Sequence, residues 1–218
     1  MTRLRFFYDL DKDVENFLKG TRSKNNPKPT KLQQAYLDMY DPTYTEERVR
    51  AFLYAHNQIS GFDAQDSVQR IEQNWRKIEP AFFERVEEIF GIQYPIPEIS
   101  VYLSTNGRST YNIDGGYFFV YTEASSTNRI IMHELFHFYT QQAFRAKLEE
   151  LGVGADRYND IKESLTELLN IEFVDLMDGA NDDGYPQHAE MRQAVRISWI
   201  ATKDIWRTIL DALSIKER

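Results

Sequence analysis

The sequence predicts a single α+β domain in which a small sheet is preceded and followed by helices along the chain of 218 residues. Three observations lead to this prediction. Residues 32–90 repeat apolar side chains mostly at helical spacing, residues 98–122 contain two stretches typical of strands, and helical patterns return after residue 127. We therefore expect a mainly helical N-terminal lobe over residues 1–95, and a sheet with further helices over residues 96–218.

The N-terminal lobe is expected to begin with a short element and to continue as helices. Residues 19–31 are polar and contain two prolines, which indicates an exposed loop. Gly61 and Asp63 are typical of a helix stop and the cap of the next helix. In the segment that follows, helical spacing persists to Gly91, and Pro80 is predicted to kink or divide that helix.

Two strands and three helices are expected in the remaining chain. In residues 98–104, EISVYLS, apolar and polar side chains alternate with the period of a half-buried strand, and YFFVYT at 117–122 is aromatic and β-branched like a second one. The predicted helices cover residues 128–151, 159–178 and 188–213, the first two ended by Gly152 and Gly179.

The composition excludes several classes of function. The chain has 34 acidic and 26 basic residues, a net charge of −8, and would repel phosphate, so we do not expect it to bind nucleic acid. It has no cysteine, so any metal must use nitrogen or oxygen ligands. No apolar run approaches the ~20 residues that span a bilayer, and aspartates interrupt the N-terminal apolar stretch too early for a signal peptide. We expect a soluble, cytoplasmic protein without membrane partners, whose oligomeric state the sequence does not indicate.

The segment RIIMHELFHFYT contains the pattern His-Glu-x-x-His, formed by His133, Glu134 and His137. On a helix, residues four apart share one face, so both imidazoles can bind one ion. Zinc held by few protein ligands keeps a position for water, lowers its pKa to about 7, and polarises a carbonyl. Glu134 would accept the proton of that water. The alternative is a buried helix that merely contains histidines, although two histidines and a glutamate are costly to bury without partners.

A metal site with two histidines needs a third ligand. Glu163 and Glu167 lie on one face of the predicted helix 159–178, which becomes apolar from Leu165 onward. Either glutamate can supply the ligand, and a solvated position near the start of the helix is the alternative for each.

The HELFH motif followed by KESLTELL resembles the gluzincin branch of the zincin metallopeptidases, in which a glutamate on the next long helix completes a zinc site. The resemblance implies a zincin-like metalloprotease fold with a small mixed sheet, Zn²⁺ bound by His133, His137 and Glu163, and Glu134 as general base. It places Glu167 beside a zinc-binding histidine, where it would orient the imidazole. The implied activity is hydrolysis of peptide bonds in a peptide or protein substrate.

The same resemblance implies a substrate strand and a donor for the oxyanion of the tetrahedral intermediate. The strand before the motif helix, Gly115 to Thr122, would form the edge of the sheet and pair with extended substrate through Gly116, Tyr117 and Phe118. The donor would be Tyr185 or His188, of which we favour His188.

Two other functions remain open at this point. A zincin-like binding module without catalytic activity would keep the fold or the metal, but it would not need Glu134 as a base. A zinc hydrolase acting on a non-peptide amide would have the same residues.

Overall fold

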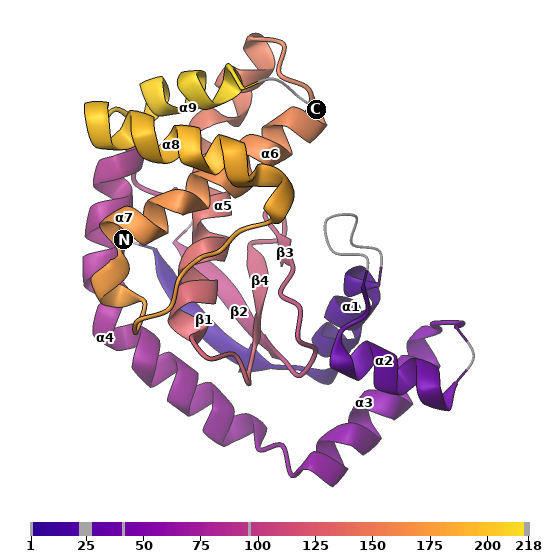
Figure 1. The fold of residues 1–218 in the computed structure, drawn as a ribbon. Helices are drawn as coiled ribbons and strands as arrows, with labels where there is room; N and C mark the ends of the chain where they lie inside the picture. The colour runs from indigo at the N-terminus through magenta and orange to yellow at the C-terminus, as the bar shows by residue number, and fades with distance from the viewer. Residues whose placement is uncertain (1, 22–27, 41, 96, 216–218) are drawn as a thin grey trace. The chain divides into compact units, whose positions relative to one another are not determined.

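The computed structural model describes residues 2–21, 28–40, 42–95 and 97–215 (Figure 1). From Thr2 onward, the contacts within the chain form two compact units. We call Thr2–Lys77 with Ile96–Ile130 the sheet unit, and Ile78–Pro95 with Ile131–Arg218 the helical unit. A small mixed sheet with many helices confirms the predicted α+β class. The N-terminal lobe, which was expected to be mainly helical, also contributes a strand that was not predicted.

The sheet has four strands in the order β1-β2-β4-β3 (Figure 1). The predicted strands are confirmed as β2, Glu98–Ser104, and β4, Tyr117–Tyr121, which pair in parallel. The unpredicted strand β1, Arg3–Tyr8, pairs in parallel with β2, and its Leu4 and Phe6 are buried while Arg3 and Arg5 are exposed. This alternation is the signature of a strand with one face covered.

The prediction that β4 forms the edge of the sheet was wrong. The loop after β2 returns as β3, Tyr111–Asn112, and pairs antiparallel with Tyr117 and Phe118. A tight turn that ends at Gly116, with φ of +67°, makes this return possible, because glycine tolerates a left-handed backbone. The backbone N–H of Phe119 also donates to Thr110, at 2.8 Å. The backbone groups of β4 on this side therefore form hydrogen bonds with the protein's own chain. A substrate-binding role of Gly116, Tyr117 and Phe118 stays a prediction.

The helices of the sheet unit begin with side-chain caps. Asp9, Thr30 and Thr45 accept hydrogen bonds from backbone N–H groups at the starts of α1, Leu10–Gly20, α2, Lys31–Met39, and α3, Glu46–Ser60. These helices share a core whose buried members are Val14, Phe17, Leu32, Tyr36, Val49, Phe52 and Leu53. Residues 22–27 of the predicted loop 19–31 lie outside the described residues, while Lys19 and Gly20 belong to the end of α1 and Lys31 begins α2.

The fourth helix, α4, is continuous from Ala64 to Phe90, so Pro80 does not divide it. The turns on either side of Pro80 hold fully buried aromatic side chains, Trp75 before it and Phe82 after it. Their burial stabilises the helix across the position where proline removes one hydrogen bond. The predicted boundary before α4 is confirmed: Gly61 is left-handed, and the Asp63 carboxylate accepts from the N–H of Asp66.

The motif helix α5, Thr127–Glu150, confirms the expected helix 128–151. From Ile131 onward it belongs to the helical unit, and its apolar residues are buried there almost all round. Phe136 lies at the centre of an aromatic cluster, with ring centroids 5.3 Å from Phe90, 5.6 Å from Phe173 and 6.4 Å from Phe82. This packing fixes the orientation of α5 within the helical unit.

The expected helix 159–178 is instead a series of short elements: α6, Ala155–Leu165, the 3-10 turn Thr166–Leu168, α7, Leu169–Glu172, and the 3-10 turn Val174–Leu176. At the first break, the Thr166 hydroxyl donates to the carbonyl of Glu163 at 2.8 Å, which competes with regular helix hydrogen bonds.

The last predicted helix, 188–213, is likewise divided. A 3-10 turn, Pro186–His188, precedes α8, Ala189–Thr202, and α9, Ile205–Leu213, lies beside α8 (Figure 1). Lys203 between them adopts a left-handed backbone, and Asp204 caps the new helix by accepting from the N–H of Arg207.

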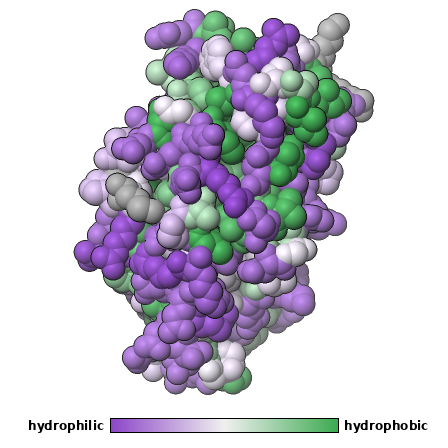
Figure 2. All heavy atoms as spheres, turned by 90° about the vertical axis from the view of Figure 1, so that its left-hand side faces the viewer, coloured by the Kyte–Doolittle hydropathy of each residue, from purple (hydrophilic) through white to green (hydrophobic). Residues whose placement is uncertain are grey.

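The face shown in Figure 2 carries mainly hydrophilic residues, with hydrophobic residues in smaller groups among them. Exposed large apolar side chains include Ile197 and Ile200 on α8 and Val174 in the turn after α7. Within the described residues, none of the helices combines the length and the apolar character needed to cross a membrane.

Candidate metal centre

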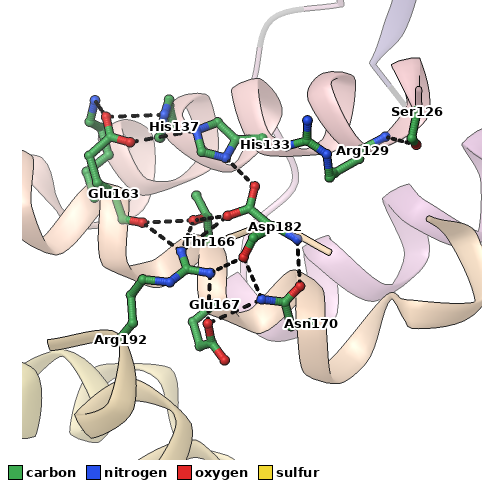
Figure 3. A network of polar contacts seen from close by, with 11 residues as sticks. Ser126, Arg129, His133, His137, Glu163, Thr166, Glu167, Asn170, Asp182 and Arg192 are labelled. Atoms are coloured by element: carbon green, nitrogen blue, oxygen red, sulfur yellow. Dashed lines mark hydrogen bonds and ion pairs between the residues drawn. The ribbon is translucent and has the colours of Figure 1, made fainter. Parts of the chain in front are cut away.

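The helical unit brings together the three side chains predicted as metal ligands. His133 and His137 lie one turn apart on α5, and Glu163 projects toward them from α6 (Figure 3). One ligand atom from each of the three residues lies within 4.8 Å of the other two. Among the described residues, this is the only such group of three that could hold a metal ion.

The Nε2 atoms of both histidines face the glutamate. Nε2 of His133 is 3.7 Å from Oε2 of Glu163, and Nε2 of His137 is 3.5 Å from Oε1. His137 and Glu163 are buried, and the side chain of His133 keeps 18% of its surface exposed. Two imidazole nitrogens and a carboxylate oxygen, partly open on one side, are a ligand set that zinc accepts in catalytic sites.

A carboxylate that the sequence did not point to orients His133. Oδ2 of Asp182 lies 2.7 Å from Nδ1 of His133, on the opposite side of the ring from Glu163 (Figure 3). A hydrogen bond from Nδ1–H to this carboxylate leaves the lone pair of Nε2 directed at the site. Asp182 is separated from His133 by 49 residues and lies in a loop, so no local pattern connects the two.

Asp182 is itself held by three neighbours. Its Oδ1 lies 3.0 Å from the hydroxyl oxygen of Thr166 and accepts a hydrogen bond from Arg192 at 3.2 Å. The Asn170 side chain accepts from the N–H of Asp182 at 2.8 Å and donates to its carbonyl oxygen at 2.7 Å. The loop is therefore fixed through both its backbone and its carboxylate.

Glu167 does not occupy the predicted position beside a ligand histidine. Its carboxylate contacts Arg192 at 2.8 Å and also pairs with Arg196. Glu163 lies in α6, whereas Glu167 lies in the 3-10 turn Thr166–Leu168, so the two side chains do not follow one regular helix. Arg192 and Asn170 each contact both Glu167 and Asp182, so Glu167 is connected to His133 indirectly. Asp182 lies beside His133, where Glu167 was expected.

Glu134 is 5% exposed, and its Oε2 is buried without a hydrogen-bond partner among the described residues. Burial, opposed in part by His133 and reinforced by Glu163, raises the pKa of Glu134 to about 7. A buried carboxylate oxygen without a partner is costly unless another molecule hydrogen-bonds to it. The arrangement suits a group that exchanges a proton with water or a substrate.

Burial and neighbouring charges shift the pKa values of His133, His137 and Glu163. Burial holds the pKa of His137 well below its usual range, so this imidazole is neutral. Burial alone would also lower the pKa of His133, but the charge and hydrogen bond of Asp182 raise it to about 10. Because a metal binds only the deprotonated nitrogen, a cation and a proton compete for Nε2 of His133. Burial opposes the ionisation of Glu163, yet the hydrogen bond and charge of His133 and the charge of Lys162 hold its pKa far below the usual range.

Charge also indicates what the cluster can bind. Four carboxylates are buried in and around the cluster: Glu134, Glu163, Glu167 and Asp182. Two cationic side chains, Lys162 and Arg192, are buried beside them. With all four carboxylates ionised and His133 neutral, which is the state that metal binding requires, these buried groups carry an excess of two negative charges. Without a metal, protons on His133 and Glu134, whose pKa values are raised to about 10 and about 7, offset part of this excess. A buried excess of this size is unfavourable by itself, and a divalent cation would offset it.

The predicted oxyanion donors have other partners within the helical unit. His188, in the 3-10 turn before α8, is buried, and its Nε2 lies 3.1 Å from Oδ1 of Asp160. The ring of Tyr185 packs edge-on against that of His188, with centroids 5.8 Å apart. The other ring nitrogen of His188, Nδ1, is buried without a hydrogen-bond partner among the described residues. A donor role for His188 stays a prediction.

Comparisons of the chain with protein-family models, with curated proteins and with solved structures found no match.

Proposed function

We propose that this protein is a zinc-dependent metallopeptidase that hydrolyses peptide bonds. The observation that carries the proposal is the convergence of His133, His137 and Glu163, with the buried carboxylate of Glu134 on the same helix as the histidines. Two imidazoles and a carboxylate suit zinc, and the excess negative charge around them suits a divalent ion. The sequence resemblance to gluzincins supports the same activity.

Each residue of the centre has a distinct role in this proposal. His133, His137 and Glu163 would hold the zinc, and Asp182 would keep Nε2 of His133 directed at it. When bound, zinc would lower the pKa of a coordinated water and polarise the substrate carbonyl. Glu134 would accept the proton of the attacking water and pass it to the leaving amine.

The first test uses Glu134→Gln, which keeps the size of the side chain but removes the base. General-base catalysis is typically worth ~10²–10⁴-fold, so we expect this variant to fold, to retain zinc and to lose nearly all hydrolysis. The measurement is cleavage of a panel of peptides and denatured proteins, with and without a chelator. Activity that survives Glu134→Gln unchanged would contradict the proposed mechanism.

The same panel separates the peptidase from the other two functions. Zinc-loaded protein that cleaves no peptide or protein would favour a binding module. Hydrolysis of small non-peptide amides alone, lost in Glu134→Gln, would keep the mechanism and change the substrate class.

A further inference from the structure

A lysine next to the metal cluster is almost completely buried. Lys162 is 2% exposed, and its ammonium lies 3.0 Å from Oε1 of Glu163. Lysine is rarely buried to this degree, because its charge must leave water, and burial is tolerated chiefly where the charge is paired. The function proposed above gives Lys162 no role.

The ammonium contacts the same carboxylate that would bind the metal. Oε1 of Glu163 faces both Lys162 and, at 3.5 Å, His137, while Oε2 faces His133 at 3.7 Å. Lys162 therefore neutralises Glu163 from one side, whereas a metal ion would neutralise it from the side of the histidines.

This arrangement has two opposite effects on metal binding. The hydrogen bond holds the Glu163 carboxylate in place, which favours binding by the modest amount that one such bond contributes. The ammonium charge repels a divalent ion at short range, and this repulsion is strong where the surroundings are buried. The repulsion involves two full charges on the metal, so we expect it to exceed the benefit of positioning.

We propose that Lys162 is a positioning residue that serves as a permanent counter-ion of Glu163, stabilising the metal-free centre and lowering its affinity for the metal ion. This inference rests on the metal site of the proposed function. The centre would consequently bind its metal ion less tightly than the same three ligands would without the lysine.

The test compares zinc affinities, measured by competition with a chromophoric chelator, in the wild type, Lys162→Gln and Lys162→Met. Gln keeps a hydrogen-bond donor without the charge, and Met removes both. We expect both variants to bind zinc about tenfold more tightly than the wild type or better, and to melt at lower temperature when zinc is absent. The matched control is Lys147→Gln, which removes an exposed lysine charge from α5 and should leave the affinity unchanged.

The outcomes separate the inference from the function on which it rests. If Lys162 had a purely structural role, both variants would bind zinc more weakly than the wild type. Equal or weaker zinc binding in the variants would overturn the inference while leaving the zinc site intact. A wild type that binds no zinc would overturn both. If Lys162→Met does not fold, Lys162→Gln decides the question, because its side chain remains polar.

Discussion

Glu163 and Glu167 are only four residues apart, yet their carboxylates have different partners. Glu163 faces both histidines, whereas Glu167 faces Arg192 and Arg196. We therefore expect Glu163→Gln to reduce zinc affinity severely, and Glu167→Gln to reduce it by less than about tenfold, below the range typical of residues that touch a ligand. Chelator competition with both purified variants measures the difference. The opposite ranking would assign the third ligand to Glu167.

Asp182 is the residue whose role depends most on the structure rather than on the sequence. Asp182→Asn would keep a hydrogen-bonding side chain near Nδ1 of His133 but remove the negative charge that favours the Nδ1–H tautomer. Replacing a carboxylate in this position typically costs ~10–100-fold in metal affinity, and we expect a loss in that range. Affinity equal to that of the wild type would mean that Asp182 does not orient His133.

At the scale of the element, α5 is held in place by aromatic packing. Phe136 is fully buried and contacts the rings of Phe82, Phe90 and Phe173. Truncating such a side chain removes its burial and leaves a cavity, so we expect Phe136→Ala to lower the free energy of unfolding by ~3–5 kcal/mol. Chemical denaturation measures the change. Ile200→Ala, at a position that is 59% exposed on α8, is the control and should change stability by less than ~0.5 kcal/mol.

The elements that the sequence predicted well are those specified by their own residues. Strand β2 follows from the alternation of its side chains, β4 from its aromatic and β-branched residues, and the end of the motif helix α5 from Gly152. The observed bounds of all three differ from the predicted ones by a residue at most. The breaks within 159–178 and 188–213 depend on side-chain hydrogen bonds and on a left-handed Lys203, which periodicity does not report. Strand β1 did carry a readable signal, because Arg3 and Arg5 alternate with Leu4 and Phe6.

At the scale of the whole molecule, the order of elements in the sequence did not indicate how they group. The sheet shares a compact unit with residues 2–77, although it had been expected to belong with the motif helix and the C-terminal helices. Helical spacing predicted that His133 and His137 share one face, and the resemblance to gluzincins pointed to Glu163, whereas nothing in the sequence indicated Asp182, Arg192 and Asn170. Asp182 lies in a loop, Arg192 on α8 and Asn170 on α7, and long-range packing brings these elements together.

The central claim is that His133, His137 and Glu163 bind one zinc ion, and the metal content of the purified protein tests it most directly. Elemental analysis of the wild type and of His137→Ala, purified together without added chelator, should give close to one zinc per wild-type chain and little in the variant. Removing one of three ligands leaves a site too incomplete to retain the ion through purification. Equal zinc content in the two proteins, or none in the wild type after incubation with zinc, would contradict the account.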